Sequence, residues 1–476
     1  MDGLVFSNLL FLFLFLPLNL LCYWLASDIR GKNAVMLVFS LIFYAWGEPV
    51  YVFLLIFMTL ADWFLGRIIG RNRGRPLARV AMVLSCVVSL GLLGVFKYAG
   101  FVSELTHGLF GVPPQIPVIE LPIGISFYTF QLLSYVVDVY RGETKPQKKF
   151  WILLMYVSLF HQCIAGPIVR YQDVEREITS RRATAADRCE DIRRFCVGLA
   201  KKALLANVCG SLADTLVPTS GDAAVLSARP ALSLWVGMLA FMLQIYLDFS
   251  AYSDMAIGMG RMIGFHYREN FDYPYLSGSV SEFWRRWHIS LGSFFRDYVY
   301  IPLGGNRLGP LRTILNLFVV WFLTGLWHGA SWNFVLWGMY FFVFIALERL
   351  FLSRTLDKAP GLFRHVYLLA VVFFGWVLFR FRDAGMMALV FRGMFCGNGN
   401  PLVNFESSTI ALNYVFFLAA AVVASTPLLA SAGRALERSA PRAAGFLQIF
   451  LPPVLLLLST AALAGDSYNP FLYFQF

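Results

Sequence analysis

The chain has 476 residues, of which 58% are hydrophobic and only 14% are charged. A soluble protein carries about 25% charged residues, so the composition excludes an ordinary soluble enzyme and indicates a protein that crosses a membrane many times. The net charge of +11 comes from short clusters of lysine and arginine between apolar runs, a pattern typical of cytoplasmic membrane loops rather than of a nucleic-acid-binding surface.

Apolar runs that approach the length of a membrane-spanning helix, about 20 residues, recur along the whole chain. They lie at 5–24, 77–98, 122–140, 195–216, 231–250, 313–330, 332–348, 365–380, 410–430 and 446–464. Two shorter runs, 34–46 and 50–66, are expected to form a tight hairpin through Gly47 and Pro49. We therefore predict an all-α polytopic integral membrane protein with about 10–12 transmembrane helices. The first run is expected to be a span rather than a signal peptide, because no positive segment precedes it.

The charges of the connecting loops predict their side of the membrane. The loops 67–79 and 141–149 are rich in arginine and lysine and are expected in the cytoplasm, whereas the loop 99–121 has neither residue and is expected outside. Alternation of the spans from these loops predicts that the N- and C-termini both lie outside.

The apolar run 151–168 does not fit a simple span. Basic clusters flank both of its ends, and it contains Gly166 and Pro167, a break that is tolerated at membrane depth only where protein or water surrounds the backbone. We expect a re-entrant hairpin that returns to the cytoplasmic side, followed by an interfacial helix in the charged segment 170–194. The sequence shows no internal repeat and no separable soluble domain, so a single membrane-embedded domain is expected.

The segment 279–298 predicts a helix at the membrane surface. Ser279 and Glu282 have the spacing of a capping box, in which each side chain satisfies a free amide of the helix start. At helical spacing one face is aromatic, while Arg285, His288 and Arg296 share another face. A helix with these two faces typically lies in the headgroup layer.

His328 lies inside the following apolar run, where an ionisable residue indicates a functional site. Gly325 and Gly329 are one turn apart and allow a neighbouring backbone or a thin ligand to approach. Thr324, four residues before the histidine, can orient its ring. A buried and neutral imidazole is a suitable general base. The alternative is a packing histidine that is hydrogen-bonded to a carbonyl group.

His288 allows two interpretations. On the cationic face of a surface helix it is solvated or paired with Glu282 or Asp297, which gives it a structural or binding role. If the helix folds inward, His288 shares a cavity with His328 and has a direct chemical role.

Two acids, Asp248 and Asp254, lie at the end of an apolar run. The simplest interpretation is ion pairing with arginines such as Arg261, Arg285 or Arg286, and the alternative is a carboxylate that acts as a general acid. No third residue lies at a spacing typical of metal ligands, and the seven cysteines form no CxxC pair. The sequence therefore predicts neither a metal site nor a disulfide framework.

A basic cluster is expected on the cytoplasmic side. Its members can bind lipid headgroups, the usual role, or the phosphates of a donor such as coenzyme A or a phosphopantetheine arm. The cluster comprises the donor-binding candidates Arg285, Arg286, Arg296 and Arg307, together with Lys201 and Lys202.

The last eight residues, NPFLYFQF, are rich in aromatic side chains. Such a run is typical of an interfacial belt. Tyr473 also provides a hydroxyl group that can reach into a cavity.

Several of these segments together resemble the membrane-bound O-acyltransferase (MBOAT) family, in particular its bacterial branch typified by the membrane subunit of alginate O-acetyltransferase. The matching segments are LPIGISFYTFQLLSYVVDVYRGE (121–143), IAGPIVRY (164–171), DFSAYSDMAIGMGRMIGF (248–265), ENFDYPY (269–275), EFWRRWHISLGSFFRDYVYIPLGGNR (282–307) and LTGLWHGASWNF (323–334). The resemblance implies re-entrant and interfacial helices around a central tunnel. It also implies a catalytic core at 121–350 between N-terminal spans at 1–120 and C-terminal spans at 351–464, with an extracytoplasmic aromatic tail at 465–476.

The resemblance implies that His328 is the essential histidine of the family and that His288 is its second characteristic histidine. The implied reaction transfers an acyl group, usually acetyl, from a cytoplasmic thioester to a hydroxyl group outside, and His328 takes the hydroxyl proton. The thioester donor is acetyl-CoA or a phosphopantetheine carrier protein, and no bound cofactor is expected. The candidates for the tunnel lining are Thr324, Trp327, Asn333, Asp248 and Asp254.

The aromatic tail found in related systems implies that Tyr473 is an acyl relay. It would pass the group to an extracytoplasmic esterase-like partner protein that acts on a polysaccharide, with the chain in the cytoplasmic membrane of a bacterium and no nucleic acid involved. Two alternatives stay open. One is D-alanyl transfer to teichoic acid by the same fold, and the other is a glycan or lipid transporter, against which the absence of repeated halves counts.

Overall fold

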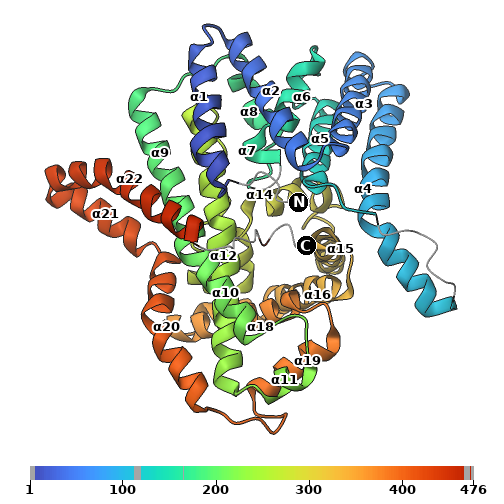
Figure 1. Ribbon diagram of the computed structural model, residues 1–476. Helices are drawn as coiled ribbons and strands as arrows, with labels where there is room; N and C mark the ends of the chain where they lie inside the picture. The colour runs from blue at the N-terminus through green and yellow to red at the C-terminus, as the bar shows by residue number, and fades with distance from the viewer. Residues whose placement is uncertain (1–5, 112–118, 164–165, 466–471, 473–476) are drawn as a thin grey trace. The chain divides into compact units, whose positions relative to one another are not determined.

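A computed structural model of the protein describes residues 6–111, 119–163, 166–465 and 472, except for the side chains of residues 185–187. Within these ranges the chain is helical and contains no strand (Figure 1). The prediction of an all-α polytopic membrane protein is therefore confirmed.

Among the described residues, nine helices are long and apolar enough to cross a membrane. They are Tyr51–Arg71, Pro76–Phe110, Arg188–Leu216, Ala231–Met262, Pro310–His328, Trp332–Lys358, Gly361–Arg380, Phe405–Ala424 and Pro441–Gly465. The sequence predicted ten to twelve crossings. Three of the twelve predicted runs are not among these nine. The runs 5–24 and 122–140 form the shorter helices Phe11–Leu25 and Ile125–Arg141, and the run 34–46 forms Ile29–Gly47. The predicted hairpin through Gly47 and Pro49 is present between Ile29–Gly47 and Tyr51–Arg71.

The chain forms two compact units. The first comprises Met1–Phe195 and Tyr252–Glu269, and the second comprises Cys196–Ala251 and Asn270–Phe476. The boundary falls inside the predicted catalytic core 121–350, so the division at residues 120, 350 and 464 stays a prediction.

The first unit contains the N-terminal helices. They are η1 (Phe11–Phe15), α1 (Leu16–Leu25), α2 (Ile29–Gly47), α3 (Tyr51–Arg71), α4 (Pro76–Phe110), α5 (Ile125–Arg141), α6 (Phe150–Ser158), α7 (Phe160–Cys163), α8 (Tyr171–Thr179) and most of α9 (Ala185–Ala200). The predicted re-entrant region consists of α6 and α7, which are both too short to span a bilayer. Helix α6 ends because Leu159 takes a non-helical ψ of 114°.

The second unit contains the remaining helices. They are η2 (Lys201–Ala206), α10 (Asn207–Leu216), α11 (Ala223–Ala228), the first part of α12 (Ala231–Met262), η3 (Pro274–Leu276), α13 (Val280–Arg286), α14 (Ile289–Phe295), η4 (Arg296–Tyr300), α15 (Pro310–His328), α16 (Trp332–Leu347), η5 (Glu348–Leu352), α17 (Ser353–Lys358), α18 (Gly361–Arg380), α19 (Ala384–Met394), α20 (Phe405–Ala424), α21 (Leu428–Ser439) and α22 (Pro441–Gly465).

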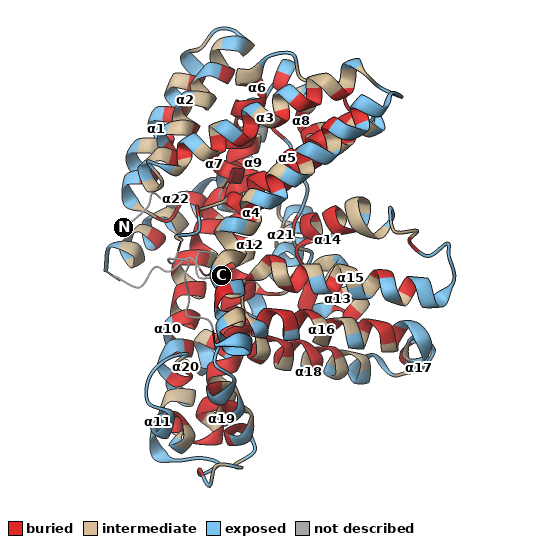
Figure 2. Ribbon diagram, turned by 90° about the vertical axis from the view of Figure 1, so that its right-hand side faces the viewer, coloured by how far each residue is buried: buried red, intermediate tan, exposed pale blue. Residues whose placement is uncertain are grey.

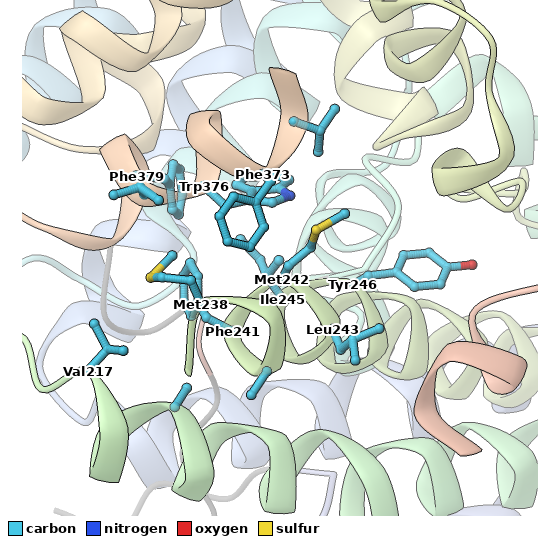
Figure 3. Packing of buried hydrophobic residues seen from close by; sticks show 14 of the residues in the cluster. Val217, Met238, Phe241, Met242, Leu243, Ile245, Tyr246, Phe373, Trp376 and Phe379 are labelled. Carbon is cyan, nitrogen blue, oxygen red and sulfur yellow. The ribbon is translucent and has the colours of Figure 1, made fainter. Parts of the chain in front are cut away.

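The core of the second unit lies between α12 and α18. Met238, Phe241 and Met242 of α12 belong to the same buried cluster as Phe373 and Trp376 of α18, and Figure 3 shows these two sets of side chains together. The most apolar part of α12 is 78% buried, whereas that of α22 is only 11% buried (Figure 2). Helix α12 is therefore a central element, while α22 presents most of its apolar surface outward.

Glycine brings α15 and α16 into backbone contact. A Cβ atom on Gly325 would lie 2.5 Å from the carbonyl oxygen of Phe334, and one on Gly338 would lie 2.4 Å from that of Trp321. Any side chain at these positions would force the helices apart. Of the two possibilities predicted for Gly325, a neighbouring backbone or a thin ligand, the structure shows the backbone of α16 close to this glycine.

The prediction of one helix over 279–298 is wrong. Helix α13 ends at Arg286, and His288 takes a left-handed φ of 46° before α14 begins at Ile289. The predicted start is correct in part: the Ser279 side chain accepts from the Glu282 backbone amide, but the Glu282 carboxylate accepts from Gly278 instead of Ser279. The predicted cationic face disappears because the break turns His288 inward.

Candidate active site

His328 is the last residue of α15, next to the turn that leads into α16. Its half-buried imidazole ring is surrounded by aromatic rings from three helices. The ring centroids of Trp327, Trp337 and Phe379 lie 4.9, 4.9 and 5.4 Å from that of His328, all in edge-on geometry. Since these rings are rigid and buried, they hold the orientation of the imidazole.

His288 is 2% exposed, so the prediction of a solvated histidine on a surface helix is not supported. Its ring lies 4.8 Å from the ring of Phe249 and 5.8 Å from that of Trp327, centroid to centroid. Trp327 thus contacts both histidines. The inward position of His288 agrees with this arrangement, while its direct chemical role stays a prediction.

Burial controls the charge of His288. The residue lies between the candidate spans Ala231–Met262 and Pro310–His328. Desolvation lowers the pKa of His288 from its usual 6.5 to about 3. The imidazole is therefore neutral at physiological pH and can accept or donate hydrogen bonds without carrying charge.

Two tunnel-lining candidates beside His328 have structural partners. The Thr324 hydroxyl donates to the Val320 carbonyl oxygen at 2.7 Å, within its own helix. The Asn333 side-chain amide donates to the Phe379 carbonyl oxygen at 3.1 Å and so ties the start of α16 to the end of α18. Asn333 therefore helps to place Phe379 against His328.

Asp248 forms a buried ion pair, but not with the arginines named from the sequence. Its carboxylate lies 2.7 Å from Lys202 Nζ, and these two side chains are only 2% and 4% exposed. The other carboxylate oxygen accepts from the Leu472 backbone amide at 3.0 Å. Both acids also lie within α12 rather than at its end, because the helix continues to Met262.

Asp254 belongs to the first unit, where it pairs with Arg194 at 2.9 Å. Arg261 pairs instead with Asp191 at 3.2 Å. The partners predicted for the two acids are therefore wrong, although ion pairing as such is present.

The four donor-binding candidates lie in exposed or half-exposed positions. Arg285, Arg296 and Arg307 are exposed. Arg286 pairs with Glu282 at 2.8 Å, and Arg296 pairs with Asp297 at 2.7 Å. Solvent-exposed pairs of this kind contribute about 0–1 kcal/mol, so they leave these side chains available to a ligand.

The acyl-relay candidate Tyr473 lies outside the described residues. Leu472, the residue before it, is described and is 7% exposed. It belongs to the same buried cluster as Trp337 and Phe379, the rings that contact His328. Leu472 is thus held in the unit that contains both histidines.

Across the described residues, no group of three or more histidine, cysteine, aspartate or glutamate side chains is placed to hold a metal ion. The site presents the imidazole rings of His288 and His328 among aromatic side chains.

Sequence reasoning missed several residues of this site. Trp337 and Phe379 were not singled out, because aromatic residues are common in every apolar run of this chain. Asn270 and Ser290, which contact His288, were also missed. Asn270 lies in the segment ENFDYPY. This segment contributed to the resemblance to the family, but it indicated no role for the Asn270 side chain.

A comparison with known proteins identifies the family of this chain. Residues 152–391 match the model of the MBOAT, membrane-bound O-acyltransferase, family. The chain belongs to this family and is an O-acyltransferase.

Within the family, the chain lies in the branch of the alginate O-acetylases. It is 38% identical to the probable alginate O-acetylase AlgI of Pseudomonas putida over 99% of this chain and 100% of that protein. It is also 29% identical to the peptidoglycan O-acetyltransferase of Helicobacter pylori, covering 84% of this chain and 81% of that protein. A more distant relative is the teichoic acid D-alanyltransferase of Bacillus subtilis, 24% identical over 48% of this chain and 59% of that protein.

Proposed function

We propose that this protein transfers an acetyl group from a cytoplasmic thioester to an extracytoplasmic polysaccharide, with His328 as the general base. The full-length similarity to alginate O-acetylases supports the acetyl group and the polysaccharide acceptor. The observation that carries the catalytic assignment is the enclosure of His328 by Trp327, Trp337 and Phe379. This enclosure fixes the ring and limits access of water.

The proposed step is an acyl transfer. His328 removes the proton of the acceptor hydroxyl as its oxygen attacks the thioester carbonyl carbon. The new ester C–O bond forms and the C–S bond breaks. The imidazolium then gives its proton to the leaving thiolate. General-base catalysis of this kind contributes about 10²- to 10⁴-fold, and alignment of the two substrates contributes the rest.

The first acceptor in this proposal is the Tyr473 hydroxyl, which acts as an acyl relay. Support comes from its neighbour Leu472, whose amide is held by Asp248 and whose side chain is buried in the cluster that contacts His328. The acylated tyrosine would then pass the group to an esterase-like partner protein outside the membrane. That partner would acetylate the polysaccharide.

The proposed membrane is the cytoplasmic membrane of a bacterium, with both termini outside. This orientation rests on the basic loops 67–79 and 141–149. The donor, acetyl-CoA or an acyl carrier protein, would bind on the cytoplasmic side, where the exposed Arg285 and Arg307 can meet its phosphates.

A second candidate function is D-alanyl transfer to teichoic acid from a carrier protein. The similarity to the B. subtilis D-alanyltransferase, which extends over about half of this chain, supports this second function. Identity is higher and coverage is complete for the acetylases, so acetyl transfer is the leading proposal.

The test uses purified full-length protein in detergent with radiolabelled acetyl-CoA and, in parallel, radiolabelled D-alanyl carrier protein. Wild type should consume the acetyl thioester and place label on the C-terminal peptide, whereas His328→Ala should do neither. Tyr473→Phe should abolish the label on that peptide while the protein level is unchanged.

Three results would contradict parts of this proposal. Transfer by His328→Ala at the wild-type rate would exclude His328 as the base. Label that persists on the Tyr473→Phe peptide would exclude the relay. Label from D-alanyl carrier protein but not from acetyl-CoA would favour the second candidate function.

A further inference from the structure

His288 lies in a small polar cluster inside the second unit. Asn270, 1% exposed, follows α12 by a short loop, and its backbone oxygen accepts from the Ile289 amide at 3.0 Å. Its side-chain oxygen accepts from the Ser290 backbone amide at 3.2 Å and from the Ser290 hydroxyl at 2.8 Å. The same oxygen lies 3.2 Å from His288 Nδ1.

These contacts fix which atoms donate. A backbone N–H can only donate, so the Asn270 atom that faces the Ser290 amide must be the amide oxygen rather than the NH₂ group. That oxygen can only accept. The nitrogen of His288 that faces it, Nδ1, must therefore carry the proton.

A neutral imidazole carries one proton, so Nε2 is then left with a free lone pair. This nitrogen is buried and has no hydrogen-bond partner within the part of the chain that the structure describes. The lowered pKa of His288 supports the neutral form. Nε2 can accept a hydrogen bond, but it cannot donate one to a carbonyl oxygen.

The backbone at His288 supports a built site. Its left-handed φ of 46° is rare for a residue other than glycine. Such conformations are strained and persist where surrounding contacts hold them, often at active sites. Asn270 supplies such contacts to the two residues that follow His288, by accepting from the backbone amides of Ile289 and Ser290.

We propose that Asn270 is a positioning residue that holds His288 in the Nδ1-protonated tautomer, so that Nε2 accepts a hydrogen bond from the attacking hydroxyl group. The proposal rests on the acyltransfer function proposed above. Trp327 contacts both imidazole rings, and a hydroxyl group bound beside it can be oriented by His288 while His328 removes its proton. His288 is thereby excluded as the donor that stabilises the oxyanion.

Among the described residues, the groups in contact with the His288 ring come from four elements, and none of them is a charged side chain. They are Phe249 of α12, Asn270 and Phe271 of the following loop, Ser290 of α14, whose hydroxyl oxygen lies 3.4 Å from Nδ1, and Trp327 of α15. Asn270→Asp would place a carboxylate against Nδ1. It would keep the acceptor and raise the pKa of His288, because a negative charge stabilises the imidazolium.

The experiment compares Asn270→Asp, Asn270→Leu and Ser290→Ala in full-length protein. Selective ¹⁵N-histidine NMR reports the tautomer, and His288→Gln assigns the signal. We expect a protonated Nδ1 and a free Nε2 in wild type and in Ser290→Ala, which keeps the Asn270 contact to His288. Asn270→Leu should give a mixture of tautomers and lower kcat by up to about 100-fold.

The pH profile separates this role from a purely structural one. Asn270→Asp should retain activity at alkaline pH and lose it toward acid at a higher pH than wild type, because protonation of Nε2 removes the acceptor. A protonated Nε2 in neutral wild-type protein, or an unshifted profile in Asn270→Asp, would overturn the proposal. The NMR result needs no turnover, so failure of acyl transfer in wild type would count against the proposed function and not against the tautomer.

Discussion

At the scale of single residues, Trp327 has the central place in the site, because its indole ring contacts both His288 and His328. Replacing it by leucine would keep an apolar side chain but remove the rigid indole ring that contacts both imidazole rings. We expect Trp327→Leu to lower kcat for thioester consumption by about 10- to 100-fold, because misplaced catalytic groups lose rates of this order.

Trp46, which lies in α2 and is 57% exposed, provides the control. Trp46→Leu makes the same chemical change at an exposed tryptophan outside the α15–α16 hairpin. Equal losses of kcat in both variants would show that the effect is a general consequence of losing tryptophan.

At the scale of elements, the hairpin of α15 and α16 depends on two glycines. A methyl group at Gly325 or Gly338 would overlap a carbonyl oxygen of the facing helix. We expect Gly325→Ala or Gly338→Ala to destabilise the protein by about 1–3 kcal/mol, the usual effect of overpacking, and to lower the thermal unfolding midpoint in detergent.

Gly433 in α21 serves as the comparison, because a Cβ atom there would meet nothing within 4 Å. Since alanine is the better helix former, Gly433→Ala should be neutral or stabilising by about 0.5–1 kcal/mol. A hairpin variant as stable as Gly433→Ala would mean that the two helices can separate without loss.

The elements also show what the sequence could predict. Apolar length and turn residues located most helices to within a few residues, for example 332–348 against Trp332–Leu347. The break at His288 could not be predicted, because its left-handed backbone is held by Asn270 from a separate loop. The predicted partner of Asp248 was wrong because that contact is also non-local. Lys202 reaches Asp248 only where two helices pack together, and no local sequence pattern encodes that packing.

At the scale of the whole molecule, several helices present apolar side chains outward. The most apolar part of α20 is 17% buried, and Phe416 and Phe405 of this helix are 86% and 88% exposed. An aspartate in the middle of a span costs about 2.5–3.5 kcal/mol and much less near its ends. Phe416→Asp should therefore reduce the amount of protein in the membrane fraction, while Phe405→Asp, at the start of the helix, should not.

Membrane fractionation followed by quantitative immunoblotting checks this difference. The variant Phe416→Leu, which stays apolar, should match wild type. Equal amounts of the two aspartate variants in the membrane would contradict the assignment of α20 as a span.

The buried pair of Lys202 and Asp248 has a consequence for the biogenesis of the protein. The two residues lie inside successive candidate spans, Arg188–Leu216 and Ala231–Met262. Each charge alone would oppose entry of its helix into lipid by about 2.5–3.5 kcal/mol. The lysine is synthesised first, so its helix is expected to wait at the insertion machinery until the next helix brings the carboxylate. Both helices then enter the bilayer together, with these two charges paired.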